Sequence, residues 1–190
     1  PATLHPNYVK VIKAYTEGIG IELLTVPEKE GVTDLSALEA MMDETIGSVV
    51  IQTPNFYGNL EDAKAIDTIV HKNSKCLLIA SVDPVSLAVL IPPSEYNADI
   101  AVGEGQALGN NMYMGGPLFG FFATKLDMAR LMPGRIVGGT IDKAGEKAYV
   151  LTLQAREQHI RRAKATSNIC SNESLCTLAA VVYLCLLVCV

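Results

Sequence analysis

The chain has 190 residues, of which 49% are hydrophobic and 18% are charged, and its formal net charge is -5. This apolar content is enough for one domain with its own core, and it excludes an intrinsically disordered chain. The negative charge and the scattered lysines and arginines argue against a nucleic-acid-binding protein, which usually carries a basic face. We therefore expect a single domain over residues 1–190 that has no nucleic-acid partner.

The first part of the chain alternates between amphipathic helices and short apolar strands. We expect a helix around residues 8–15 that Gly18 ends, a helix around residues 35–42 that Thr33 caps, and a helix over residues 60–73. The expected strands are residues 21–26, 48–53, 76–82 and 98–102. Strands that are apolar on both faces and spaced by helices predict an α/β protein whose mainly parallel sheet has helices on both faces.

The pattern changes after residue 103. A strand over residues 119–123 and a short helix over residues 127–132 precede a predicted hairpin of residues 135–140 and 147–153, turned by residues 142–145. Ser171 is expected to open a last helix, whose residues 178–190 form an unbroken apolar run. A membrane span needs about 20 apolar residues, so a buried helix covered by a missing segment or a partner is predicted. A tail anchor is the alternative.

The five cysteines indicate neither a disulfide framework nor a zinc site, because their number is odd and no C-x-x-C pair occurs. We expect buried thiols, Cys185 included, in a reducing compartment. No charged start followed by an apolar stretch opens the chain, so no signal peptide is predicted and a cytoplasmic protein is expected.

Candidate site residues follow the predicted strands, because ligands of open α/β sheets bind outside the carboxyl ends of the strands. These residues are Gln52, Thr53 and Asn55 after one strand, Ser81 and Asp83 after the next, and Glu104 and Gln106 after a third. The alternative role of such residues is to cap the helices that follow. No lysine stands at a predicted strand end, and the three histidines lack metal-ligand spacing.

Two further segments carry side chains of a functional type. Residues 103–109 resemble a dinucleotide-binding loop, but the last spacing is one residue too long and no helix is expected to follow. Residues 158–168 are basic and precede the apolar last helix, so they are expected to pass close to the core. We interpret His159, Arg161 and Arg162 as residues of a subunit interface, with both arginines paired to carboxylates or carbonyls.

Several strings together resemble one family. They are QTPNFYG at residues 52–58, VGEGQALG at 102–109, MPGRIVG at 132–138, REQHIRR at 156–162 and KATSNIC at 164–170. They look like the P-protein of the glycine cleavage system, and in particular the first (alpha) subunits of two-subunit bacterial glycine dehydrogenases (decarboxylating). The resemblance extends from His5 to about Tyr183.

The resemblance implies the large domain of a fold-type-I enzyme that uses pyridoxal phosphate (PLP), with a seven-stranded, mainly parallel sheet. The family's N-terminal segment and C-terminal small domain are absent from the chain. The complete enzyme decarboxylates glycine on PLP and transfers the aminomethyl group to the lipoyl arm of the H-protein. The cofactor supplies the electron sink, and the protein orients it. By this resemblance the chain belongs to an oxidoreductase of glycine catabolism, and the chain by itself is expected to be inactive.

The resemblance also places Gln106 where the PLP-bearing subunit has its Schiff-base lysine. A carboxamide cannot form an aldimine, so no catalytic residue and no covalent cofactor are expected here. Asp83 matches the aspartate that pairs with the cofactor's ring nitrogen, and it is interpreted as a relic or as a helix cap. We expect a partner subunit that completes a heterotetramer with a PLP-bearing second subunit. Asn55, His159, Arg161 and Arg162 are the candidate interface residues, and neither a metal nor a membrane is expected.

Two alternatives stay open from the sequence. The chain could be a self-contained PLP enzyme that uses another lysine. It could also be a nucleotide-binding module of the same fold that uses residues 103–109.

Overall fold

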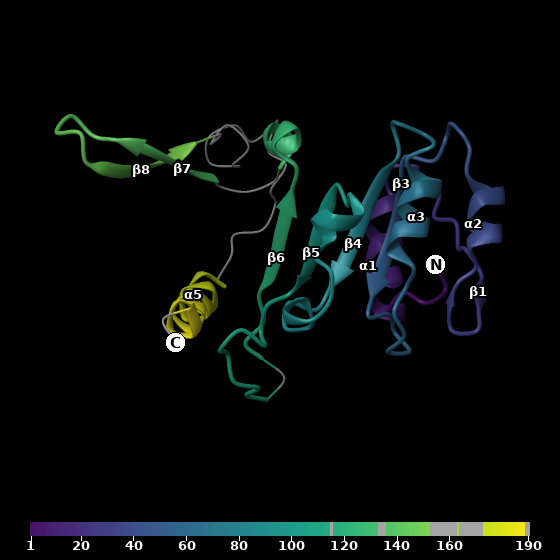
Figure 1. Cartoon of the computed structure of the whole chain (residues 1–190), viewed down its shortest axis with the longest axis horizontal. Helices are drawn as coiled ribbons and strands as arrows, with labels where there is room; N and C mark the ends of the chain where they lie inside the picture. The colour runs from purple at the N-terminus through teal and green to yellow at the C-terminus, as the bar shows by residue number, and fades with distance from the viewer. Residues whose placement is uncertain (115, 133–135, 153–162, 164–172, 189–190) are drawn as a thin grey trace. The chain divides into compact units, whose positions relative to one another are not determined.

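The computed structural model describes residues 1–114, 116–132, 136–152, 163 and 173–188 (Figure 1). The contacts divide the chain into two compact units, one formed by Pro1–Ala123 with Leu175–Val190 and the other by Thr124–Ser174. Each unit is described by itself. A single domain over residues 1–190 stays a prediction.

A four-stranded sheet forms the centre of the first unit, in the order β3 (Ser48–Thr53), β4 (Leu77–Val82), β5 (Ile100–Glu104) and β6 (Gly120–Thr124). β3 pairs in parallel with β4, and β4 pairs in parallel with β5. β6 runs antiparallel to β5, since the Gly105 N–H donates to the Phe119 carbonyl while the earlier Gly103 faces the later Phe121. The described residues therefore supply four strands to this sheet, not the seven that the resemblance implies.

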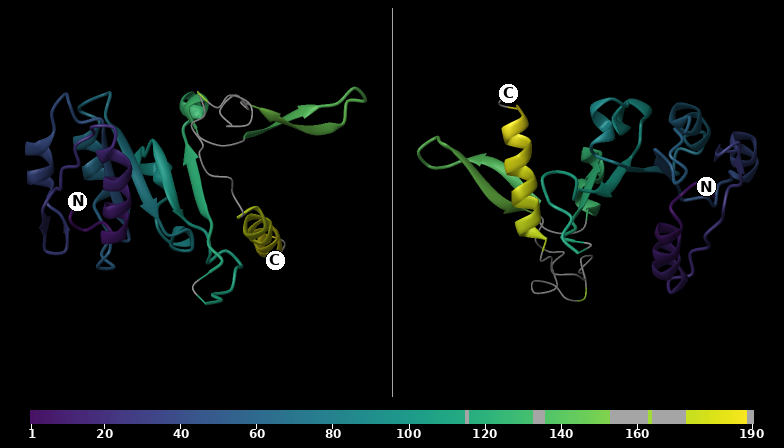
Figure 2. Two further views of the ribbon diagram at one scale, coloured as in Figure 1. Left: turned by 180° about the vertical axis from the view of Figure 1, so that it is seen from behind. Right: turned by 90° about the horizontal axis from the view of Figure 1, so that it is seen from below.

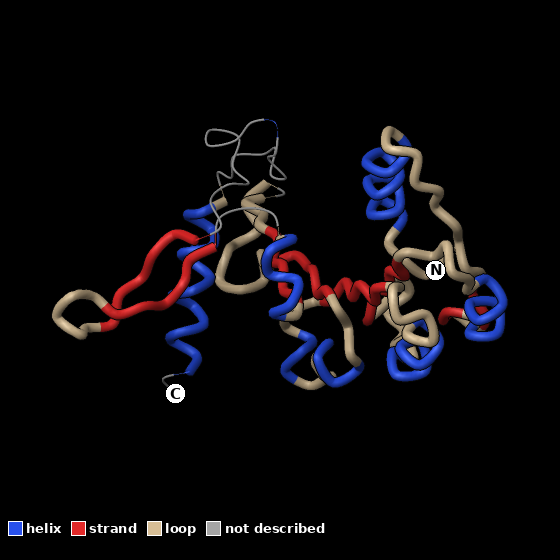
Figure 3. The backbone as a smooth tube through the Cα atoms, turned by 90° about the horizontal axis from the view of Figure 1, so that it is seen from above, coloured by secondary structure: helices blue, strands red, loops and turns tan. Residues whose placement is uncertain are grey.

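Helices cover both faces of this sheet, as the alternating pattern predicts. The buried core lies between one face and the helices α2 (Leu35–Met41) and α3 (Ala63–Val70), and it includes Leu38, Ile66 and Leu78. The helix α1 (Pro6–Glu17) lies on the opposite face of the sheet, and Figure 3 shows it on the other side of the strands from α2 and α3. The α/β class with a mainly parallel sheet is confirmed.

Two local predictions are wrong. Residues 21–26 form no strand, and Ile21, Leu23 and Leu24 are exposed, because none of the described strands pairs with them. The cap of α2 is Asp34, whose carboxylate accepts hydrogen bonds from the backbone N–H of residues 36 and 37. Thr33 instead lies in β2 (Val32–Thr33), which pairs with β1 (Glu28–Lys29) in a short hairpin that the sequence did not indicate.

The helix expected over residues 60–73 is shorter in the structure. Asp62 caps α3 by accepting from the Ala65 N–H at 3.0 Å, and His71 ends the helix. Two short 3₁₀ helices, η1 (Ser86–Ala88) and η2 (Pro93–Tyr96), connect β4 to β5.

The second unit contains η3 (Leu126–Leu131) and the hairpin of β7 (Ile136–Ile141) with β8 (Lys147–Thr152), which Figure 2 shows as a long two-stranded ribbon. The Asp142 carboxylate closes the turn by accepting from the N–H groups of Ala144 and Glu146 at 2.8 and 2.9 Å. The predicted hairpin and its turn are confirmed.

The last helix, α5 (Ser174–Val188), belongs to the first unit. Among the α5 residues whose burial is described, Ala180 alone is buried, whereas Leu175 and Leu186 are 74% and 66% exposed. The chain by itself thus leaves this helix uncovered, and its cover by a missing segment or a partner stays a prediction, whereas Cys185 is exposed rather than in the core. Ser171 lies outside the described residues. Within the described part of the chain, every helix is too short or too polar to cross a membrane.

Candidate functional site

The candidate site is the edge of the sheet where β3, β4 and β5 end. The strands are in register there, since Gln52 is paired with Ser81 and Ser81 with Val102. A cavity of about 330 Å³ opens beside this edge between α1 and the sheet. Its lining consists of Leu4, Tyr8, Val11, Ile12, Val50, Ser81, Val102, Gly103 and Glu104. The lining is mostly apolar and includes the polar side chains of Tyr8, Ser81 and Glu104, which is typical of small-molecule sites.

Gln106 lies two residues after β5, at the carboxyl edge of the sheet. Its backbone N–H donates to Glu104 Oε1 at 3.0 Å, and its carbonyl accepts from the Asn110 N–H at 3.1 Å. Glu104 Oε1 also accepts from the Phe119 N–H at 3.1 Å, so this carboxylate joins the loop to the start of β6. The sequence prediction of a strand-end position for Gln106 is confirmed.

A covalently held PLP does not fit this edge. None of residues 54–60, 83–91 and 105–109, which follow the three strands, is a lysine, and the Gln106 amide nitrogen is not nucleophilic. We therefore assign no chemical step through this cofactor to the chain's own residues.

Asp83 caps the turn that follows β4. Its Oδ1 accepts from the backbone N–H of Val85 at 2.7 Å and of Ser86 at 3.1 Å. The side chain is exposed. The sequence left two roles open for Asp83, a cap and a relic of a cofactor contact. The structure shows the capping role, and the role as a relic stays a prediction.

Asn55 is buried, and its amide joins its own loop to the turn between β1 and β2. Its Nδ2 donates to the Gly31 carbonyl and to Glu61 Oε1, each at 2.9 Å. Its Oδ1 accepts from the N–H groups of Tyr57 and Asn59 at 3.0 and 3.1 Å. Asn55 thus holds the loop after β3 in shape, and its contact with a partner subunit stays a prediction.

Glu61 is a functional-type residue that the sequence analysis missed. It is 7% exposed, and its carboxylate accepts hydrogen bonds from Thr3, Thr33 and Asn55. These partners lie 58, 28 and 6 residues away along the chain. No local sequence signal marks such a residue, because a glutamate beside a helix start is ordinarily solvated.

Aromatic side chains gather beside the same edge. The His5 ring lies 4.9 Å from the Tyr8 ring and 5.0 Å from the Phe56 ring, and the Phe56 and Tyr57 rings are 5.7 Å apart. The His5 N–H donates to Gln52 Oε1 at 2.9 Å, which ties the segment before α1 to the end of β3. Phe56 and Tyr57 are about half exposed, so their ring faces are available to planar or cationic groups.

The glycines of residues 103–109 serve packing. A Cβ on Gly103 would lie 2.2 Å from the Val82 carbonyl, and one on Gly105 would lie 2.3 Å from the Phe119 ring. Turns follow β5 instead of a helix, so the loop has no helix N-terminus for a phosphate. This agrees with the sequence argument against a dinucleotide site.

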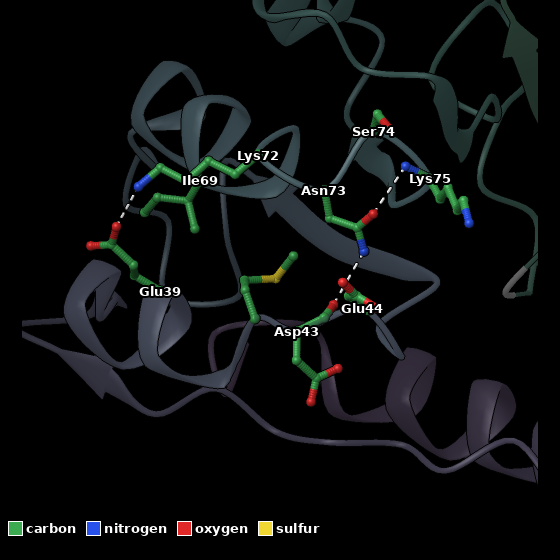
Figure 4. A pocket seen from close by; sticks show the side chains of 9 residues that line it. Glu39, Asp43, Glu44, Ile69, Lys72, Asn73, Ser74 and Lys75 are labelled. Atoms are coloured by element: carbon green, nitrogen blue, oxygen red, sulfur yellow. Dashed lines mark hydrogen bonds and ion pairs between the residues drawn. The ribbon is translucent and has the colours of Figure 1, made fainter.

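Another cavity, of about 530 Å³, lies at the opposite end of the strands, beside residues that precede β3 and β4 (Figure 4). Lys72 forms an ion pair with Glu39 across it. Asn73 Nδ2 donates to the Asp43 carbonyl at 3.1 Å, and Asn73 Oδ1 accepts from the Lys75 N–H at 3.1 Å. These charged and amide groups bind one another, so this cavity is not our candidate site.

His159, Arg161 and Arg162 lie outside the described residues, so their interface role stays a prediction. Within the described ranges, no group of three or more histidine, cysteine or acidic side chains is placed to hold a metal ion.

The fold and the edge described above define an α/β chain of the fold-type-I transferase-like class. The family model of the glycine cleavage system P-protein matches residues 1–188, and the chain belongs to this family. It is 57% identical over 183 residues to a probable glycine dehydrogenase (decarboxylating) subunit 1 of Carboxydothermus hydrogenoformans, covering 96% of this chain and 41% of the relative. The corresponding protein of Moorella thermoacetica is 54% identical over 182 residues, again covering 96% and 41%. The chain thus spans about two-fifths of the length of these relatives.

Solved structures agree with this assignment. A crystal structure of glycine decarboxylase (P-protein) of the glycine cleavage system, in inhibitor-bound form, matches with a TM-score of 0.89 and 49% identity, covering 96% of this chain and 41% of that one. A NifS-like protein matches with a TM-score of 0.54 and 19% identity over 70% of this chain and 36% of that one, which shows the fold alone.

Proposed function

We propose that the chain is part of subunit 1 of a two-subunit glycine decarboxylase and acts there as the partner subunit that carries no covalent cofactor. The complete enzyme decarboxylates glycine and transfers the aminomethyl group to the lipoyl arm of the H-protein. PLP is bound mainly by the second subunit, and the cytoplasm is the expected location. The assembly is a heterotetramer.

Gln106 is the observation that carries the proposal. It lies two residues after β5, and by the resemblance it occupies the position of the Schiff-base lysine, in a chain about half identical to subunit 1 relatives. In this proposal the chain contributes walls and orienting groups to a site shared with the second subunit. The candidates are Asn55 and the loop around it, with His159, Arg161 and Arg162.

Reconstitution with the PLP-bearing second subunit tests the proposal. We expect the two chains to form a complex, and we expect glycine-dependent exchange of CO2 only when both are present. The chain and PLP without the second subunit should show no Schiff-base absorbance band that borohydride removes. Such a band would favour the self-contained enzyme and overturn the partner role, as would full activity of the second subunit by itself.

A further inference from the structure

The Glu61 carboxylate joins three separate segments at the carboxyl edge of the sheet. Its Oε1 accepts from the Thr3 hydroxyl at 2.7 Å and from Asn55 Nδ2 at 2.9 Å, and its Oε2 accepts from the Thr33 N–H at 2.8 Å. Thr3 and Thr33 are themselves buried, so water cannot replace these donors without opening the structure. Hydrogen bonds to a buried carboxylate are stronger than those between neutral groups.

The loop after β3 takes its conformation from this carboxylate through Asn55. Glu61 Oε1 accepts from Asn55 Nδ2, and Asn55 Oδ1 accepts from the backbone N–H groups of Tyr57 and Asn59. The Phe56 N–H donates to the Thr3 carbonyl at 2.9 Å, so the Thr3 segment holds the same loop from a second side. Glu61 therefore sets where Phe56 and Tyr57 lie beside His5.

We propose that Glu61 is a positioning residue for the candidate site, because it fixes the loop that presents Asn55, Phe56 and Tyr57 at the carboxyl edge. The inference rests on the proposed function for the identity of the reaction. Glu61 does not touch substrate in this proposal. It acts through Asn55 and Thr3.

Glu61→Gln is the test, because glutamine keeps the size of the side chain but presents an N–H₂ where an acceptor is needed. One of the three contacts must then place two donors against each other. Asp62→Asn is the matched control, since Asp62 is the neighbouring acid, is exposed, and accepts from the Ala65 N–H at a position that asparagine also caps well.

Amide hydrogen exchange on the 190-residue chain within its complex reports on positioning without any activity. In Glu61→Gln we expect the Tyr57 and Asn59 amides to exchange about fivefold to tenfold faster, as loss of a buried charged hydrogen bond predicts. The amides of Ile51 and Ala80 in β3 and β4 should change less than about twofold. Asp62→Asn should behave as the wild type at all four amides.

Kinetics of the reconstituted enzyme give the second measurement. Loosening of the loop after β3 should raise KM for glycine about fivefold, because the loop binds the ground state and the transition state equally. It should change kcat less than about twofold, because the reacting groups stay in place. Equal effects of Glu61→Gln and Asp62→Asn would overturn the positioning role. Loss of exchange protection throughout β3 and β4 would also overturn the positioning role, because Glu61 would then stabilise the whole fold and not the loop in particular. If the wild-type complex does not exchange glycine CO2, the proposed function fails, and amide exchange still decides the role of Glu61.

Discussion

His71 lies between two carboxylates at the C-terminal end of α3. Its Nδ1 is 2.5 Å from Asp67 Oδ1, and its Nε2 is 3.0 Å from Asp99 Oδ2, which also accepts from the Leu78 N–H at 2.8 Å. Both ring nitrogens can donate only in the imidazolium form. Burial lowers the pKa of His71, but the hydrogen bonds and charges of Asp99 and Asp67 outweigh it and raise the pKa above its usual value.

This geometry predicts a pH-dependent stability. Because the folded pKa is raised, the contribution of His71 is fully present below its unfolded pKa of about 6.5 and is lost as pH rises through the folded pKa. We expect His71→Gln to lower the free energy of unfolding by about 1 kcal/mol at pH 6 and by less at about pH 8.5. Urea denaturation of both proteins at the two pH values measures this.

The neighbouring Cys76 thiol does not share this pH window, because burial and the charge of Asp99 raise its pKa. Lys72→Gln, which removes the exposed ion pair with Glu39, is the control and should have the same effect at both pH values. An equal cost of His71→Gln at the two pH values would contradict the imidazolium assignment.

Site residues differ in how far the sequence reveals them. Asp83 and Gln106 could be placed at strand ends because they follow apolar strands, and in the structure Asp83 comes directly after β4 and Gln106 two residues after β5. The burial of Glu61 could not be inferred, because two of its donors come from Thr3 and Thr33, far away in the chain. Asn55 was singled out as a possible partner contact, which stays a prediction, and the sequence did not indicate that its amide binds Gly31, Glu61 and Tyr57.

At the scale of elements, β5 packs closely between its neighbours. Gly103 allows this, because a Cβ there would lie 2.2 Å from the Val82 carbonyl of β4 and 2.4 Å from the Phe121 ring of β6. The first contact is with backbone, which cannot move aside cheaply. The close approach explains why β5 carries a glycine, which is otherwise unfavourable inside a strand.

Gly103→Ala should therefore lower the free energy of unfolding by about 1–3 kcal/mol, the usual cost of overpacking. Gly47→Ala is the matched control, since a Cβ at Gly47 meets nothing within 4 Å and its φ is not positive. Urea midpoints of the two variants and the wild type measure the difference. A Gly103→Ala protein as stable as Gly47→Ala would contradict the close packing of the three strands.

Elements with strong local patterns were predicted well and the others were not. The strand over residues 48–53 and the hairpin of β7 and β8 follow from apolar runs and a turn-forming Asp142. Residues 21–26 carry the same apolar pattern, but none of the described strands pairs with them. Their pattern by itself therefore predicted a strand that does not form. The β1–β2 hairpin has only two residues in each strand, too short to leave a periodic signal.

At the scale of the whole molecule, α5 leaves a large apolar surface on the chain. Leu175, Leu178, Leu186 and Leu187 are each more than half exposed. Single exposed apolar residues are ordinary, but a contiguous helix of them favours association. The helix is held at its start by Asn110, whose Nδ2 donates to the Cys176 carbonyl at 3.2 Å.

We therefore expect the chain by itself to self-associate through α5. Leu175→Lys with Leu186→Lys should shift the chain toward monomer in light scattering, while the urea midpoint of the sheet stays the same, because both side chains are exposed. Val89→Lys, at an 86% exposed position outside α5, is the control and should leave association unchanged. A wild-type chain that stays monomeric at high concentration would contradict the prediction.

Periodicity and turn chemistry by themselves determined the α/β class, the parallel strands and the strand-end position of Gln106, because these depend on residues close together in the chain. The family followed from strings of consecutive residues. Tertiary structure alone decided which polar groups are buried together, as Glu61 is with Thr3 and Thr33. It also decided which apolar segments pair with a strand, and none of the described strands pairs with residues 21–26. Burial and pairing are set by segments distant in sequence, and no local pattern records them.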